Sequence, residues 1–251
     1  MLGIGQIATR IAELIPRALP YAIVNNNPEQ SLFSRLVSYR DVQHALDAGW
    51  KWIKVTASDV DYNAFTITTA KTRIDSCWGA RFTNINTAAG QHVVAVSANH
   101  CNLTGLNTYT PGGETSNDRR GYSILGAGCL LVGCRVEDSD GSGFMLGASG
   151  GLVGTDNRLI GCVVDDADDF GFYTNTARNS FLGCTAYFTS GTNCFYVNGA
   201  NFSWVGNHSK ANMAIDSGGT NGIAVGNLID GSITDGGSGN LLTSSTYNEE
   251  Y

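Results

Sequence analysis

One short phrase recurs through the middle of this chain, and it restricts the fold more than any other feature. Two apolar residues, a glycine and a small residue appear as Leu131-Val132-Gly133-Cys134, Leu159-Ile160-Gly161-Cys162, Phe181-Leu182-Gly183-Cys184, Trp204-Val205-Gly206-Asn207 and Ala224-Val225-Gly226-Asn227. The successive glycines are 28, 22, 23 and 20 residues apart. A repeat of roughly this length indicates a solenoid, in which each repeat contributes one coil.

The composition of each repeat favours short strands joined by turns. Val, Ile, Leu, Phe, Tyr and Thr are punctuated by Gly, Asn, Asp and Ser, and no segment has the periodicity that helical repeats need. A coil of roughly 22 residues with about three short strands is the unit of a parallel β-helix. Coils stacked at about 4.8 Å bury the apolar side that a single coil exposes. The sequence therefore predicts an all-β, parallel β-helix of about seven or more coils.

Two further columns support this register. Phe144, Phe172 and Phe195 follow three of the repeated glycines at offsets of eleven or twelve residues, so they should stack on one another. The cysteines of the phrase form another column, which we interpret as free buried thiols rather than as a disulfide between Cys134 and Cys162. Free thiols fit assembly in a reducing cytosol, and no zinc-type spacing occurs, so we expect no cofactor and no metal.

The net charge of the chain limits the classes of partner that it is expected to bind. The 251 residues carry a formal net charge of −7 with few lysines, which argues against nucleic acid and against an anionic membrane surface. The sequence contains no long apolar run and no recognisable secretory signal. We therefore expect neither a membrane span nor export through a secretory route.

Residues 1–37 are expected to form an N-terminal arm. Ile4, Ile7, Ile11 and Leu14 are spaced as on one face of an amphipathic helix. The same spacing fits two heptads of a coiled-coil seam, in which isoleucine favours trimers. We predict that these four side chains bind a partner, either in a trimer seam or on a larger particle.

A short helix is expected from Ser38 to Gly49, where it would cover the first coil. Val42, Ala45 and Leu46 give it one apolar face, and Ser38 or Asp41 is suited to cap its start. Such a helix protects strand edges that would otherwise be unpaired. We therefore divide the chain into an arm at 1–37, a β-helix at 38–240 and a C-terminal tail at 241–251.

This entry segment resembles that of phage tailspikes and other pectate-lyase-like right-handed β-helices. Members of this family commonly open with a helix of the Asp-Val-Gln-x-Ala-Leu-Asp-Ala-Gly type, which here runs from Asp41 to Gly49. A strand at Trp52 to Val55 and a first coil at Phe65 to Phe82 follow it. The resemblance implies right-handed coils, a homotrimer and a phage virion protein.

Acidic residues follow two of the glycines at matching offsets. Glu137-Asp138-Ser139-Asp140 comes after the first, and Asp165-Asp166-Ala167-Asp168-Asp169 comes after the second. Stacking would place Asp138 beside Asp166 and Asp140 beside Asp168, and such proximity raises at least one pKa. We favour solvated turn aspartates. A glycan-contacting surface, a cation site and a glycosidic acid pair of Asp138 and Asp166 are the alternatives.

Aromatic and basic residues stand near these acids. Tyr173 and Tyr187 offer the kind of aromatic face that binds sugars beside carboxylates, although such faces also pack at trimer interfaces. If a glycan binds, we expect Asp140, Asp168, Tyr173 and Tyr187 to contact it. Arg119 and Arg120 end a polar run that we expect to be a solvated loop or, alternatively, a contact with an acidic neighbouring subunit.

The motifs of enzymatic β-helices are largely absent. Polygalacturonase-like β-helices resemble one another in an Asn-Thr-Asp, an Asp-Asp, a Gly-His-Gly and an Arg-x-Lys, of which only Asp165-Asp166 occurs here. We therefore predict a non-enzymatic, trimeric phage virion surface protein, either a capsid decoration (cement) protein or a short spike. It would be assembled in the host cytoplasm and anchored to other capsid or tail proteins by its arm. The alternative is a tailspike-like depolymerase, a glycoside hydrolase or lyase that attacks host surface glycan through Asp138 and Asp166.

Overall fold

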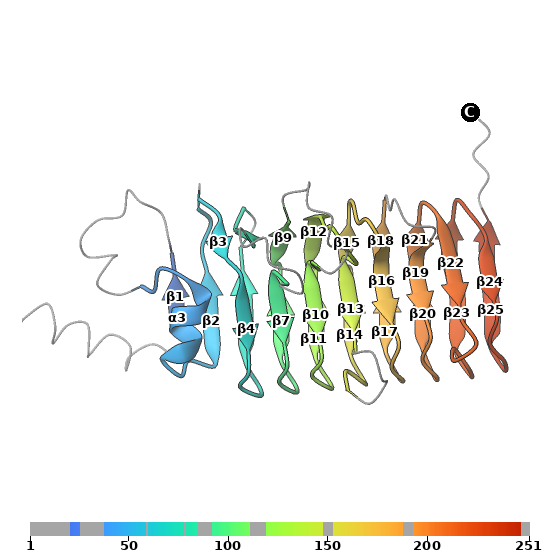
Figure 1. Cartoon of the computed structure of the whole chain (residues 1–251), viewed down its shortest axis with the longest axis horizontal. Coiled ribbons are helices and arrows are strands. Elements are labelled where there is room, and N and C mark those ends of the chain that lie inside the picture. The colour runs from blue at the N-terminus through green and yellow to red at the C-terminus, as the bar shows by residue number, and fades with distance from the viewer. Residues whose placement is uncertain are drawn as a thin grey trace, which may run out of the picture.

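The computed structural model describes residues 21–25, 38–58, 60–77, 79–84, 92–110, 119–147, 153–187 and 193–246. Within these residues, nearly all regular structure is parallel β-strand in two long sheets, and helix α3 (Val42–Asp47) stands near one end. Figure 1 shows the strands as rows of arrows side by side along a rod. This arrangement is consistent with a β-helix-like solenoid, as the repeat predicts.

The 17-stranded sheet contains two ladders of strands that meet at β23. The first ladder pairs, in order, β1 (Ala22–Val24), β2 (Trp52–Val55), β5 (Arg73–Ser76), β8 (Asn102–Thr104), β11 (Leu130–Val132), β14 (Arg158–Ile160), β17 (Ser180–Leu182), β20 (Ser203–Val205), β23 (Ile223–Ile229) and β25 (Leu241–Thr246). The second ladder pairs β3 (Tyr62–Asn63), β6 (Arg81–Thr83), β9 (Asn107–Tyr109), β12 (Arg135–Asp138), β15 (Val163–Val164), β18 (Thr185–Ala186) and β21 (His208–Ser209), and then the end of β23.

The eight-stranded sheet forms the third row of strands, and its members alternate along the chain with those of the two ladders. It pairs β4 (Phe65–Ile67), β7 (Val94–Val96), β10 (Tyr122–Ile124), β13 (Phe144–Leu146), β16 (Phe170–Thr174), β19 (Asn193–Val197), β22 (Asn212–Ile215) and β24 (Ile233–Asp235). A strand from each row therefore follows in turn, so residues one repeat apart become direct neighbours.

The repeated glycines form the corner between the first and second ladders. Gly133, Gly161 and Gly183 have φ angles of 58°, 59° and 59°, a left-handed conformation that costs other residues about 1–2 kcal/mol. The amide of Gly133 donates to the carbonyl of Ile160, and that of Gly161 donates to Leu182, both at 2.9 Å. The recurring phrase is therefore the end of a strand followed by its corner, as predicted.

The phenylalanine column is also confirmed. Phe144 pairs in register with Phe172, and Phe172 pairs with Phe195. Their ring centroids are 5.1 and 4.7 Å apart with nearly parallel planes. Tyr122 extends the column at 4.5 Å from Phe144. All four rings are buried, so the stack forms a continuous core along the rod, favoured by aromatic packing and by burial of apolar area.

The cysteine column continues as an asparagine ladder. All seven cysteines are free, and all but Cys77 are buried, which confirms the interpretation as free thiols. Below them, Asn207 Oδ1 accepts from the amide of Cys184 at 2.8 Å, and Asn227 Oδ1 accepts from the amide of Asn207 at 2.9 Å. The side chains thus satisfy buried amides at a corner, where backbone groups would otherwise lack partners.

Helix α3 closes the start of the stack. Asp41 Oδ1 accepts from the amide of His44 at 2.8 Å and caps the helix, while Val42 and Ala45 are buried. The helix contacts β1, β2 and β4. Gln43 Oε1 accepts from the amide of Thr66 at 2.9 Å, so a side chain occupies the outer edge of β4, the first strand of its sheet.

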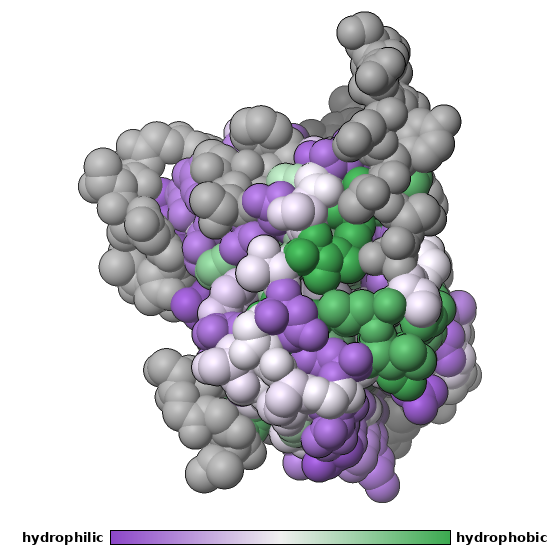
Figure 2. Space-filling model, turned by 90° about the vertical axis from the view of Figure 1, so that its right-hand side faces the viewer, coloured by the Kyte–Doolittle hydropathy of each residue, from purple (hydrophilic) through white to green (hydrophobic). Residues whose placement is uncertain are grey.

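The two ends of the stack extend into the ranges assigned to the arm and the tail. Strand β1 pairs with β2, and β25 pairs with β23. At the C-terminal end, Figure 2 shows apolar side chains gathered on the end of the rod. Leu241 of β25 is 56% exposed there. The predicted arm helix with Ile4, Ile7, Ile11 and Leu14 lies outside the described residues.

Candidate functional site

The candidate site lies where the second ladder turns into the eight-stranded sheet. Asp138 ends β12, and Asp166 follows β15 in the next coil. Pairing of Val136 with Val164 fixes the register of the two strands. Beyond them, the amide of Asp168 donates to the carbonyl of Ser139 at 2.9 Å. The backbone therefore holds Asp138 and Asp166 at equivalent positions of neighbouring coils, the placement that their offsets predict.

The electrostatics of this corner follow from that placement. Burial raises the pKa of Asp138, and the charges of Asp166, Asp140 and Asp168 raise it further. Burial likewise raises the pKa of Asp166, with the charges of Asp168 and Asp165 acting in the same direction. The corner is thus a group of like charges in which protonation is easier than in free aspartate, a property that general acids share.

Asp140 differs from its neighbours because it is buried in an ion pair. Its Oδ2 lies 2.7 Å from Nη2 of Arg119, and the two side chains are only 4% and 1% exposed. The prediction that Asp140 contacts a glycan therefore fails, since a glycan at the surface cannot reach its carboxylate. The expectation of a solvated loop is also wrong for Arg119, because the fold draws this residue inside as the partner of Asp140.

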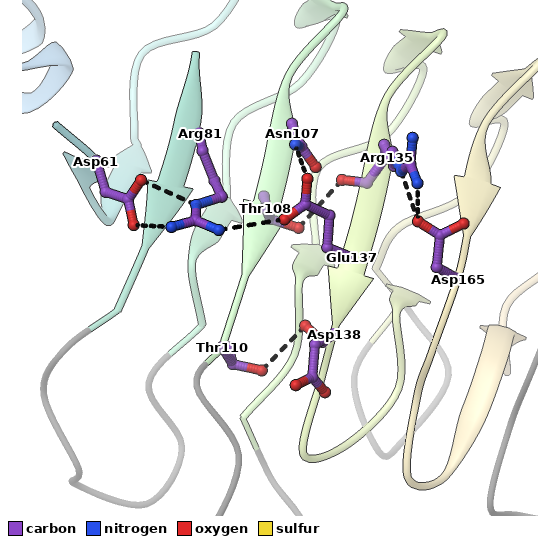
Figure 3. Close-up of polar contacts among 9 residues, drawn as sticks. All are labelled: Asp61, Arg81, Asn107, Thr108, Thr110, Arg135, Glu137, Asp138 and Asp165. Atoms are coloured by element: carbon purple, nitrogen blue, oxygen red, sulfur yellow. Dashed lines mark hydrogen bonds and ion pairs between the residues drawn. The ribbon is translucent and has the colours of Figure 1, made fainter. Parts of the chain in front are cut away.

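A network of arginines neutralises the other acids of the second ladder. Arg81 forms two hydrogen bonds of 2.9 Å with Asp61 and lies 3.5 Å from Glu137. Asn107 Nδ2 donates to Glu137 Oε1 at 2.6 Å. Arg135 Nε donates to Asp165 Oδ2 at 2.5 Å. Figure 3 shows these contacts as a row that crosses β6, β9 and β12.

Asp138 does not belong to this row. Figure 3 shows its carboxylate pointing away from Arg81 and Glu137. Its backbone carbonyl accepts from Thr110 Oγ1 at 3.1 Å, which ties the strand end to the preceding coil. Glu137, Asp140 and Asp165 are therefore paired with arginines and have a structural role, whereas Asp138 and Asp166 lie at equivalent corner positions of neighbouring coils.

A groove opens beside this group on the outer face of the eight-stranded sheet. It has a volume of about 230 Å³ and is lined by Arg120, Ser142, Met145, Asp169, Phe170, Tyr173 and Asn175. Ser142 Oγ donates to Asp169 Oδ2 at 3.1 Å. The rings of Tyr173 and Tyr196 stack with centroids 5.4 Å apart, and Phe170 packs 4.8 Å from Tyr196. The groove thus combines aromatic faces with a carboxylate, a guanidinium and an amide.

The charged groups of the groove are coupled. Burial raises the pKa of Asp169, while the hydrogen bond from Ser142 and the charge of Arg120 oppose that rise. Burial also raises the pKa of Tyr173, and the charge of Asp169 adds to it. A concave site with aromatic walls and a few polar groups suits a ligand with apolar faces and many hydroxyls, which is the chemistry of a sugar.

The structure brings together only some of the predicted glycan-binding residues. Tyr173 lines the groove. Asp168 is exposed at the corner beside it, and Tyr187 is 50% exposed with its ring edge-on to His208 at 6.3 Å. These two residues are not part of the groove lining. Sequence reasoning missed Arg120, Asp169 and Phe170 as groove residues.

A usable signal for the groove was present in the sequence. Met145, Tyr173 and Tyr196 each follow a residue of the phenylalanine column and are paired with one another in register. Because side chains alternate along a strand, a residue next to an inward column faces outward. An outward pair of tyrosines on neighbouring coils therefore indicates the face on which the groove lies.

Other kinds of site find no support in the described part of the chain. Among those residues, no group of three or more His, Cys, Asp or Glu side chains is placed to hold a metal ion. No helix there is both long and apolar enough to cross a membrane. Comparisons of the chain with protein-family models, with curated proteins and with solved structures find no match.

Proposed function

We propose that this chain is a phage virion surface protein, either a capsid decoration protein or a short spike. In this proposal it is a right-handed parallel β-helix of seven or more coils, forms a homotrimer and is held to capsid or tail proteins by its N-terminal arm. Its chemistry is binding rather than catalysis. Assembly takes place in the host cytoplasm, and the protein then stands on the virion surface.

The observation that carries this proposal is the stack that α3 closes at one end. The helix buries Val42 and Ala45 against the first strands, and Gln43 occupies the outer edge of β4. This is the entry arrangement that resembles tailspikes. The acids Glu137, Asp165 and Asp140 are each paired with an arginine, a use of charge that supports a rigid scaffold.

Particle binding tests the proposal. Purified chain is mixed with virions that lack it, and the bound fraction is measured by sedimentation. We expect the full chain to bind and a deletion of residues 1–19 to abolish binding, with Tyr187→Ser as a folded control that binds normally. Binding that survives the deletion would count against the arm, and failure of the full chain to bind would count against the virion role.

A second candidate function has its own supporting observation. The raised pKa values of Asp138 and Asp166 fit a glycan depolymerase that uses one protonated and one ionised carboxyl group, and the aromatic groove begins at Asp169, three residues after Asp166. In that function the groove holds the glycan and Tyr173 stacks on a sugar ring.

Two measurements separate glycan binding from glycan cleavage. Cleavage is followed as new reducing ends, or as new unsaturated ends for a lyase, after incubation with host polysaccharide. Binding is followed by calorimetry on the same polysaccharide. Cleavage abolished by Asp166→Asn would sink the non-enzymatic proposal. Binding that Tyr173→Ala weakens, with no cleavage, is the outcome expected of a surface protein that attaches to host glycan.

A further inference from the structure

One outward-facing column on the first ladder is aliphatic over five successive coils. Register pairs its members in order, and they are Val132, Ile160, Leu182, Val205 and Val225. Ile160 and Val205 are each 37% exposed. The outer face of a sheet that meets water normally carries polar residues. We call these five side chains the aliphatic ridge.

A strip without side chains runs beside the ridge. It consists of Gly133, Gly161, Gly183, Gly206 and Gly226, and a Cβ added at any of them would meet no atom within 4 Å. Its far side is bounded by outward residues of the second ladder, including Val163, Thr185 and Leu228. At its N-terminal end the strip continues into a hollow of about 230 Å³, whose lining comprises Gly79, Gly105, Leu106, Asn107, Gly133, Arg135 and Glu137. We call this strip the glycine furrow.

We propose that the ridge and the furrow form a side-by-side interface between copies of this chain, with the rods parallel. Rotation about an axis parallel to the rod turns the ridge of each copy toward the furrow of its neighbour. Five coils span about 19 Å at the strand spacing, and a second stack with the same spacing matches the ridge residue for residue. This arrangement is compatible with the homotrimer proposed above and also with a homodimer.

The distribution of charge identifies the occupant as a second copy. The chain carries a net charge of −7, so copies repel unless they meet through an uncharged surface. The ridge and the five glycines of the furrow contain no charged residue, and the charged residues of the adjoining hollow, Arg135 and Glu137, are each in an ion pair. Arg135, which lies at the edge of the furrow, is neutralised by Asp165 of the next coil. A nucleic acid would need a basic surface, and a glycan would find no hydrogen-bonding side chain on the ridge.

Oligomeric mass tests this interface. The full chain of 26.5 kDa is examined by light scattering coupled to size-exclusion chromatography, as wild type and with Leu182→Lys or Val205→Asp. We expect a multimer for wild type, and a dissociation constant raised at least about tenfold by either charge. Tyr187→Lys is the control, because Tyr187 is 50% exposed but follows β18 of the second ladder and belongs to neither the ridge nor the furrow. Circular dichroism verifies that each variant is folded.

Cross-linking provides a second measurement that does not depend on variant stability. A photoreactive amino acid replaces Val205 in the full chain. We expect covalent links from position 205 to the partner's residues around the glycine furrow. A monomeric wild type, an assembly unaffected by either charge, or cross-links directed elsewhere would overturn the proposal. The particle-binding experiment tests the N-terminal arm and not the furrow. A negative result for this interface can therefore be distinguished from a negative result for the virion role.

Discussion

At the scale of single residues, the ion pair between Arg119 and Asp140 supports the acidic corner. Arg119→Ala would leave a buried carboxylate without its partner, and we expect this to cost about 3–5 kcal/mol of unfolding free energy. Arg178→Ala removes an ion pair with Asp156 that is about half exposed, and it should cost much less, because solvent screens an exposed ion pair. Urea unfolding of both variants measures the difference. Equal losses would show that the Arg119 pair is solvated.

Removing the charge of Asp166 should have the opposite effect and raise the free energy of unfolding at neutral pH. Because the folded pKa of Asp166 lies above its usual value, the folded state binds more protons than the unfolded state, and stability falls as pH rises through that window. Asp166→Asn removes the cost of burying this charge and its repulsion by Asp168 and Asp165, and it should stabilise the protein at neutral pH by about 0.5 kcal/mol, a value that allows for solvent screening.

The pH dependence distinguishes this effect from a general change in stability. The gain from Asp166→Asn should vanish as pH falls below the usual aspartate range of about 4, where the wild-type carboxyl is also protonated. Asp47→Asn, on the exposed face of α3, serves as the control and should show little dependence. Chemical unfolding across this pH range is the measurement. A gain that persists in acid would mean that the charge of Asp166 is not its cause.

The sequence predicted that Asp138 and Asp166 lie close together, but it did not predict the ion pair between Arg119 and Asp140. Asp138 and Asp166 follow corner glycines at the same offset, so a stack must bring them together. Arg119 lies 21 residues before Asp140, in a polar run with no repeat partner, and a polar run does not reveal which of its charges will be buried. Residues that stack in columns can be predicted from their spacing in the sequence. Contacts made by a segment inserted between coils cannot, because that segment has no counterpart in the other repeats.

At the scale of elements, the corner glycines should tolerate side chains according to backbone conformation alone. Gly183 has a φ of 59° and free space around the Cβ position. Gly183→Ala should therefore cost about 1 kcal/mol through strain, and Gly183→Asn less, because asparagine adopts this conformation more readily. Gly171→Ala should cost more, since its Cβ would lie 2.7 Å from the carbonyl oxygen of Cys194.

Thermal and urea unfolding rank these three variants. If Gly183→Ala and Gly183→Asn cost the same, left-handed strain is not what selects glycine there.

The repeated glycines also explain why the fold could be predicted from the sequence. The phrase with its glycine encodes a corner, and the phenylalanines encode a column. The groove depends on outward residues such as Met145 and Phe170, whose importance appears only when neighbouring coils are aligned.

At the scale of the whole molecule, the two ends of the stack differ. At the start, α3 covers the first strands and Gln43 binds the edge of β4. At the other end, β24 and β25 are the last strands of their sheets among the described residues, and Leu241 is largely exposed. Each coil contacts mainly its neighbours, so stability should be a sum of local terms that the closed end helps to protect.

Disrupting the closed end should therefore unravel the stack locally. Ala45 is fully buried under α3, and Ala45→Asp would place an uncompensated charge there, which displaces the helix. We expect hydrogen exchange to accelerate in β1 to β4, with β13 to β22 still protected, because stacked coils fray from an end. His44→Gln, on the exposed face of the same helix, should leave exchange unchanged. Equal acceleration along the entire rod would mean that the coils unfold as one cooperative unit and that the cap protects all of them.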